Sequence, residues 1–134
     1  INMKKTIFII FIISIFSCSP QNCPVLIYNE LNKMTYGDNN LPYTGRCVIY
    51  IDGKISSIQQ YLNGKDYGKW TFYHSNGRVE TKGKFNEFGQ RSGKWKYYYK
   101  NGELKQISKY SNGERVGKWS VYDSIGRVVE EINY

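Results

Sequence analysis

The sequence contains few of the residues from which active sites and metal centres are usually built. There is one histidine, His74, and neither a second histidine nor a Cys-x-x-Cys pair accompanies it, although a metal or catalytic site would need such partners. Glu130 and Glu131 are adjacent, so in a strand they would point to opposite faces and could not act together on one substrate. No phosphate-binding loop or nucleophile motif is present. We therefore expect no enzyme activity, no metal and no cofactor, and we expect His74 to be an exposed turn residue.

After residue 44 the apolar residues show no helical period of about 3.6 residues. A short sequence phrase recurs in this part of the chain instead. The phrase Gly-Lys-Trp occurs three times, starting at Gly68, Gly93 and Gly117, and a degenerate copy starts at Gly45. A fixed period of about 24 residues indicates a repeat architecture. Each copy continues with alternating aromatic and polar residues and then a turn glycine, which follows Asn or Asp in three of the four copies. This pattern predicts one hairpin per copy, and therefore an all-β fold with a single antiparallel meander of about eight strands.

Strand alternation assigns the side chains of each hairpin to two faces. One face would carry the core, with a glycine where the chain turns between hairpins: Trp70, Trp95, Trp119, Phe85, Tyr110, Gly68, Gly93 and Gly117. The other would carry a basic ladder beside a tyrosine ladder: Arg46, Lys69, Lys94, Lys118, Tyr50, Tyr73, Tyr98 and Tyr122. This second face is the candidate binding surface. The alternative is that its lysines are only solvated and its tyrosines only pack across strands.

Each second strand also begins with an apolar residue, six positions before the aromatic residue that recurs near its end. In the second hairpin these two residues are Val79 and Phe85. Since side chains in a strand alternate with a period of two, we expect both to lie on the same face.

The repeated pattern resembles a known family. The sequence Gly-Lys-Trp-x-x-Tyr-x-x-x-Gly, then a charged strand ending in Tyr, then Asn-Gly-x-x-x-Gly, is similar to the variant MORN repeat of small bacterial proteins. The entry segment Leu-Pro-Tyr-Thr-Gly at residues 41–45 also resembles the opening of many such proteins. The resemblance implies one twisted sheet over residues 41–134, with repeats at 45–67, 68–92, 93–116 and 117–134. It implies no shared catalytic residue, and such proteins are often labelled antitoxin-like.

The N-terminal segment, residues 1–18, differs in character from the rest. Lys4 and Lys5 follow Met3 and precede an almost unbroken apolar run at residues 7–16, which predicts a helical secretory signal peptide too short to span a membrane. Residues 15–18, Ile-Phe-Ser-Cys, resemble a lipoprotein box, so Cys18 is the expected lipidation site. The expected location is the bacterial cell envelope, with a lipid anchor in the outer membrane facing the periplasm, because no acidic residue follows the cysteine.

Residues 19–40 are predicted to be a tether and entry segment, with an extra edge strand at residues 25–28. Two cysteines remain beside the lipidation site. Cys23 and Cys47 would be in an oxidising compartment and could pair, which would fix the tether to the first hairpin. Alternatively, Cys47 is simply a small core residue, because it occupies the position of the repeated tryptophan.

The charge of the chain limits its partners. It carries 19 Lys and Arg against 11 Asp and Glu, a net charge of +8. Such a charge fits anionic partners, and export argues against nucleic acid. We expect a lipid-anchored scaffold, attached to the membrane by its N-terminal lipid, that binds a protein or an anionic envelope polymer through the Lys/Tyr face. The alternative is an antitoxin-like or immunity-like protein that neutralises one specific toxin.

Overall fold

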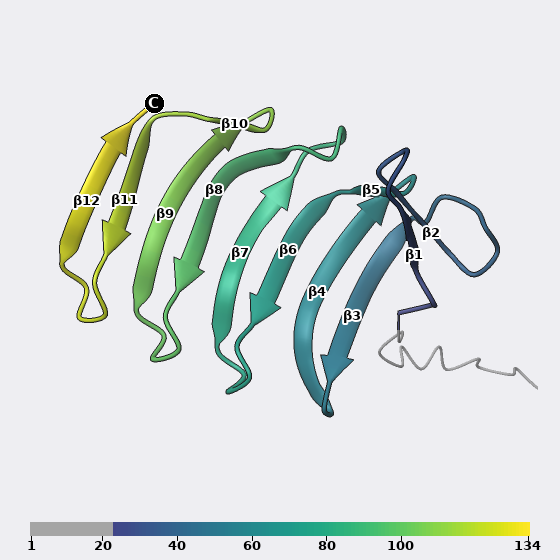
Figure 1. Cartoon of the computed structure of the whole chain (residues 1–134), viewed down its shortest axis with the longest axis horizontal. Helices are drawn as coiled ribbons and strands as arrows, with labels where there is room; N and C mark the ends of the chain where they lie inside the picture. Colours follow the sequence, from purple (N-terminus) through teal and green to yellow (C-terminus); the bar gives the residue numbers. More distant parts are fainter. Residues whose placement is uncertain (1–22) are drawn as a thin grey trace, which may run out of the picture.

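The computed structural model describes residues 23–134, and the predicted signal peptide, its helix and Cys18 lie outside these described residues. One sheet dominates the described part (Figure 1). No helix within it is long and apolar enough to span a membrane. The long strands of the sheet are β3 (Gly45–Ile51), β4 (Lys54–Leu62), β6 (Gly68–Tyr73), β7 (Val79–Phe85), β8 (Arg91–Tyr98), β9 (Leu104–Ser111), β11 (Lys118–Tyr122) and β12 (Val128–Asn133).

The long strands lie side by side in their chain order, from β3 at one edge to β12 at the other. Every neighbouring pair is antiparallel. Two short strands extend the ends of the hairpins: β5 (Lys65–Asp66) pairs with β4, and β10 (Glu114–Arg115) pairs with β9. The predicted all-β antiparallel meander is confirmed.

Each hairpin carries the same irregularity near its turn. In the second hairpin Phe72 pairs with Thr81, but the next residue, Tyr73, pairs with Val79, which leaves Glu80 as an extra residue in β7. The other three hairpins have the same shift at the equivalent place. A bulge of one residue reverses the alternation beyond it. Val79 therefore lies on the face of Tyr73 and not on that of Phe85, so the expectation that the two share a face is wrong.

The glycine of each Gly-Lys-Trp phrase lies where one hairpin leads into the next. Its backbone has a positive φ of 67° at Gly93, and the equivalent Gly68 and Gly117 have 64° and 62°. Residues with a Cβ rarely adopt this conformation, whereas glycine does so readily. The glycine is thus needed to reverse the chain direction and to start the next strand with its tryptophan on the correct face.

The face that carries the tryptophans is called here the aromatic face. A line of eight rings crosses it, each in contact with the next at centroid distances of 5.1–6.5 Å. This aromatic spine consists of Tyr43, Tyr61, Trp70, Phe85, Trp95, Tyr110, Trp119 and Tyr134. Trp95 is the most buried ring, with 2% of its surface exposed. Since a single sheet has no second layer, edge-to-face and tilted contacts between neighbouring rings provide its core.

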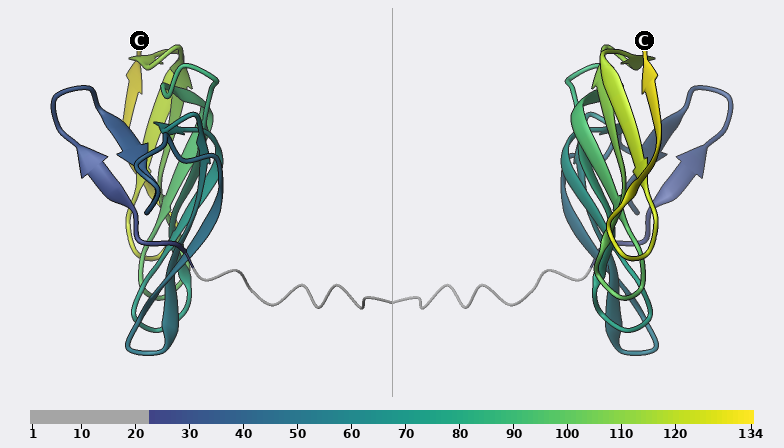
Figure 2. Two further views of the ribbon diagram at one scale, coloured as in Figure 1. Left: turned by 90° about the vertical axis from the view of Figure 1, so that its right-hand side faces the viewer. Right: turned by 90° about the vertical axis from the view of Figure 1, so that its left-hand side faces the viewer.

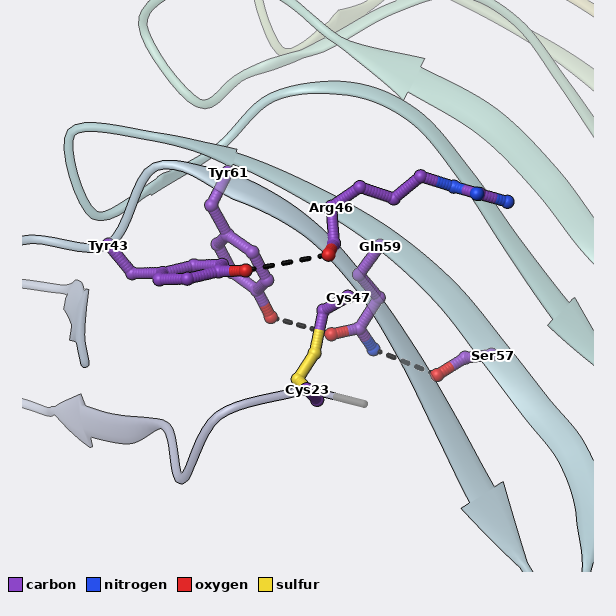
Figure 3. Close-up of a disulfide and its surroundings, with 7 residues drawn as sticks. All are labelled: Cys23, Tyr43, Arg46, Cys47, Ser57, Gln59 and Tyr61. Carbon is purple, nitrogen blue, oxygen red and sulfur yellow. Dashed lines mark hydrogen bonds between the residues drawn. A yellow bond between two sulfur atoms is a disulfide. The ribbon is translucent and has the colours of Figure 1, made fainter. Parts of the chain in front are cut away.

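A small separate hairpin projects away from the main sheet near its β3 edge (Figure 1 and Figure 2). It consists of β1 (Ile27–Asn29) and β2 (Met34–Tyr36), which pair only with each other, and we call residues 23–40 the flap. A disulfide joins Cys23 of the flap to Cys47 of β3, with their Cα atoms 4.7 Å apart (Figure 3). Cys47 is fully buried at the tryptophan position of its hairpin.

The predicted extra edge strand at residues 25–28 is therefore corrected. The strand that forms is Ile27–Asn29, and it does not extend the edge of the main sheet. The disulfide fixes the start of the flap to the aromatic face rather than to the outer edge of β3. Backbone hydrogen bonds from the Thr35 N–H to the Gly64 carbonyl and from the Tyr43 N–H to the Thr35 carbonyl fix its other end. Cys23 and Leu26, near the start of the flap, consequently pack against Cys47, Tyr61 and Trp70 at the first part of the aromatic spine.

Candidate functional site

The face opposite the aromatic face carries a row of basic side chains. The row runs across the strands, and each contributing strand provides one side chain to it. Arg46, Lys69, Lys94 and Lys118 each lie one residue before the tryptophan position, so alternation turns them to the other side. Pairing adds two lysines from the second strands: Lys84 lies opposite Lys69, and Lys109 lies opposite Lys94. We call these six residues the lysine row. All six are exposed.

The row extends over much of the sheet, with one shift in register between β7 and β8, where Lys84 lies opposite Ser92 and not Lys94. The neighbouring strands β6, β7, β8, β9 and β11 each contribute one lysine to it. In β4 the equivalent position is Gln60, and in β12 it is Asn133. With about 4.8 Å between strands, the row extends about 30 Å from Arg46 to Lys118. A second, shorter row lies beside it, where Lys82 pairs directly with Lys96.

These lysines are opposed by other lysines rather than by acids. The described residues contain three ion pairs, and only one of them involves the row, between Lys118 Nζ and a carboxylate oxygen of Glu131 at 2.6 Å. The hydrogen bond from Lys118 lowers the pKa of Glu131. Like charges directly opposite each other on neighbouring strands destabilise a sheet. The three pairs Lys69–Lys84, Lys94–Lys109 and Lys82–Lys96 are thus unfavourable for folding alone.

The predicted tyrosine ladder lies on the same face but not beside the row. Tyr50, Tyr73, Tyr98 and Tyr122 pair with the apolar residues Ile55, Val79, Leu104 and Val128. Four residues along a strand correspond to about 13 Å, so a level of intervening side chains separates the two ladders. One lysine of the second row reaches the tyrosines, since Lys82 Nζ lies 5.4 Å from the Tyr98 ring centroid. The tyrosines therefore cover the turn end of this face, and the lysines form the basic strip.

Sequence reasoning missed Lys84 and Lys109, although a signal for them exists. Each immediately precedes the recurring aromatic residue of its second strand, Phe85 or Tyr110. Because those aromatics belong to the spine, the residue before each must point to the opposite face. Once the tryptophan face is chosen, the same alternation that gives Lys69 also gives Lys84.

His74 does not extend this site, and its position differs from expectation. It is half-buried, and its Nε2 lies 3.0 Å from the carbonyl oxygen of Tyr98 in the next hairpin. A similar link joins the turns, where the Asn76 amide donates to the Lys100 carbonyl. The prediction of an exposed turn residue is wrong in that His74 helps to hold neighbouring hairpins together. Within residues 23–134, no group of three or more His, Cys, Asp or Glu side chains could hold a metal ion.

Comparison with known proteins adds nothing to this geometry. No family model, curated protein or solved structure matches the chain. The proposed function therefore depends on the geometry of the site itself.

Proposed function

We propose that this protein is a non-enzymatic, lipid-anchored envelope protein built from variant MORN-type hairpins, whose lysine row binds a linear anionic polymer of the envelope. The single observation that carries the proposal is the row itself: five neighbouring strands of the sheet each present an exposed lysine, and within two hairpins these lysines are directly opposed. Such an arrangement opposes folding, and a bound polyanion would convert the repulsion into attraction.

The spacing of the row fits an extended ligand. A polymer that crosses the strands at right angles would meet a cation about every 5 Å over these strands. A small anion would contact only one or two lysines and would gain little in water. A polymer gains from all of them at once, and lysine suits this task because its ammonium group is a mobile point charge. Affinity should therefore increase with ligand length and decrease with salt.

The MORN-type assignment is supported by features that recur at equivalent places in the hairpins. These are the bulge near each turn, the positive φ of each phrase glycine and the spacing of the spine rings. The lipid anchor is supported by the sequence at residues 15–18 alone. If Cys18 carries the lipid, Cys18→Ser will release the full-length protein from the membrane fraction of the producing cells. A variant that stays in that fraction would refute the anchor.

The polymer proposal is tested with two variants that lose equal charge. In the row variant, glutamine replaces Lys69, Lys84, Lys94 and Lys109. In the control variant, glutamine replaces four exposed lysines outside the row: Lys33, Lys54, Lys65 and Lys100. Binding of fluorescent poly-glutamate and of polyphosphate is measured by anisotropy at several salt concentrations. We expect the row variant to lose at least about tenfold in affinity, and the control to lose less than about threefold.

Two outcomes would overturn the proposal. Equal losses in both variants would mean that only net charge matters and that the row is not a site. A crosslinking pull-down from native membranes with the tagged full-length protein provides the second check. One stoichiometric protein partner that remains bound at high salt would favour a neutraliser of one specific protein instead.

A further inference from the structure

A second candidate site lies on the aromatic face, between the flap and the sheet. It is a cleft of about 550 Å³ near the first rings of the aromatic spine. Tyr28 of the flap lines it from one side, and Tyr61 and Trp70 of the sheet line it from the other. Asp66 contributes a carboxylate to the same cleft. Because the lysine row is on the opposite face, this site does not depend on the proposed function.

The next two hairpins show what normally occupies the equivalent place. The Arg91 guanidinium lies 4.4 Å from the Trp95 ring centroid, and the Arg115 guanidinium lies 4.3 Å from that of Trp119. Each arginine is four residues before its tryptophan and directly opposite a spine aromatic in the preceding strand. A cation over an aromatic face is attracted by the negative potential of the ring. In both of these hairpins, a guanidinium of the protein itself therefore occupies the place over the tryptophan ring.

In the first of the three tryptophan hairpins, the same position holds an acid. Asp66 is four residues before Trp70 and directly opposite Tyr61, as Arg115 is opposite Tyr110. Within residues 23–134, its carboxylate takes part in no ion pair. Partial burial raises its pKa, so the charged form is penalised in the protein alone. Trp70 thus has a carboxylate beside it where the other two tryptophans have their own cation.

We propose that this cleft binds the guanidinium group of an arginine side chain from a polypeptide partner. The guanidinium would lie over Trp70, as Arg91 lies over Trp95, and would donate hydrogen bonds to the Asp66 carboxylate. A planar cation with several donors matches both a ring face and a carboxylate. Tyr61 adds no charge of its own to the cleft, since a tyrosine hydroxyl is protonated at physiological pH and burial raises the pKa of Tyr61 further, to about 12.

The surroundings of the cleft suit a polypeptide better than a free amine. The cleft is larger than one side chain, and its mouth exposes apolar residues of the flap. Leu26 and Tyr28 of the flap line the cleft, and Tyr28 is 52% exposed. These side chains would contact the residues on either side of the bound arginine, and burial of apolar area would add to the affinity.

The test uses the indole N–H signals of the three tryptophans. The full-length, disulfide-bonded protein is titrated with N-acetyl-arginine amide and followed by ¹⁵N NMR. We expect the Trp70 signal to shift and saturate, while Trp95 and Trp119 stay unchanged because their own arginines occupy the position. N-acetyl-citrulline amide, a neutral molecule of the same shape, is the matched ligand control and should cause no shift. A short peptide with one arginine should bind more tightly than the amide.

Two substitutions at Asp66 complete the design. Asp66→Asn should weaken binding at least about tenfold, since it removes a charge-assisted pair, whereas Asp38→Asn in an exposed loop should leave it unchanged. Asp66→Arg should move the Trp70 signal in the direction that the ligand moves it and should abolish further binding. The proposal is overturned if citrulline shifts Trp70 equally, if N-acetyl-lysine amide binds as tightly as the arginine compound, or if Asp66→Asn binds normally.

Discussion

Gly83 and Trp95 offer the sharpest test of how the single sheet is held together. An ideal Cβ at Gly83 would overlap the Trp95 ring, which lies directly over this glycine. Gly83 is not among the glycines with a positive φ, so alanine would be tolerated by the backbone itself. We therefore predict that Gly83→Ala destabilises the protein only because the tryptophan is present.

The expected magnitudes follow from the contacts of the ring. Trp95 contacts Phe85 and Tyr110, and its indole nitrogen donates to the Lys84 carbonyl at 3.2 Å. Replacing a buried tryptophan with alanine typically costs about 3–5 kcal/mol. Forcing a methyl group under the ring should cost about 1–3 kcal/mol. Without the ring, Gly83→Ala should instead be neutral or should stabilise by about 0.4–1 kcal/mol, since it restricts the unfolded chain.

A double-mutant cycle measures this change of sign. The free energy of unfolding is obtained from urea titrations followed by circular dichroism, for the wild type, both single variants and the double variant. We expect a coupling energy of about 2 kcal/mol between the two sites. Trp119→Ala is the control background, in which Gly83→Ala should keep its full destabilising effect. Additive effects of Gly83→Ala and Trp95→Ala would show that the ring does not lie over the glycine and would refute the spine as described.

Three further predictions concern charge and crosslinking. Lys84→Gln should raise the free energy of unfolding by about 0.2–1 kcal/mol, because it removes a like-charge pair, and the gain measured by urea titration should shrink at high salt. Asp66→Asn should stabilise the protein at pH 7. Burial raises the folded pKa of Asp66 above its ordinary value of 3.8, so stability falls as pH rises through the folded pKa, and the advantage of asparagine should vanish below that ordinary value; a gain that persists in acid would contradict this cause. Reduction of the Cys23–Cys47 disulfide should cost about 2–4 kcal/mol, seen as a lower urea midpoint, and the Cys23→Ser variant should match the reduced protein.

Much of the sheet follows from local sequence rules. Gly-Lys-Trp phrases, strand alternation and turn glycines are enough to predict hairpins in a meander, since each hairpin is closed by residues near in the sequence. Alternation also separates Trp95 from Lys94 without any knowledge of tertiary structure. These features are predictable because they depend on neighbours along the chain.

Other features depend on backbone details that alternation does not contain. The bulge at Glu80 reverses the faces of β7, so Val79 was assigned to the wrong side. The expectation of an edge strand at residues 25–28 is wrong because nothing in that segment specifies which surface a short apolar strand will contact. The cleft beside Asp66 could not be predicted, since it needs both the flap and the comparison with Arg91 and Arg115 in space.

The meander has a consequence for how such a protein can change its reach. Every long strand is hydrogen-bonded only to the long strands next to it in the chain. Inserting one further unit of about 24 residues would add two strands and about 10 Å of sheet without disturbing the existing contacts. If the inserted unit copied the one that begins at Gly93, it would add two lysines, equivalent to Lys94 and Lys109, to the lysine row. The number of units would then act as a ruler for the length of ligand that the protein can hold.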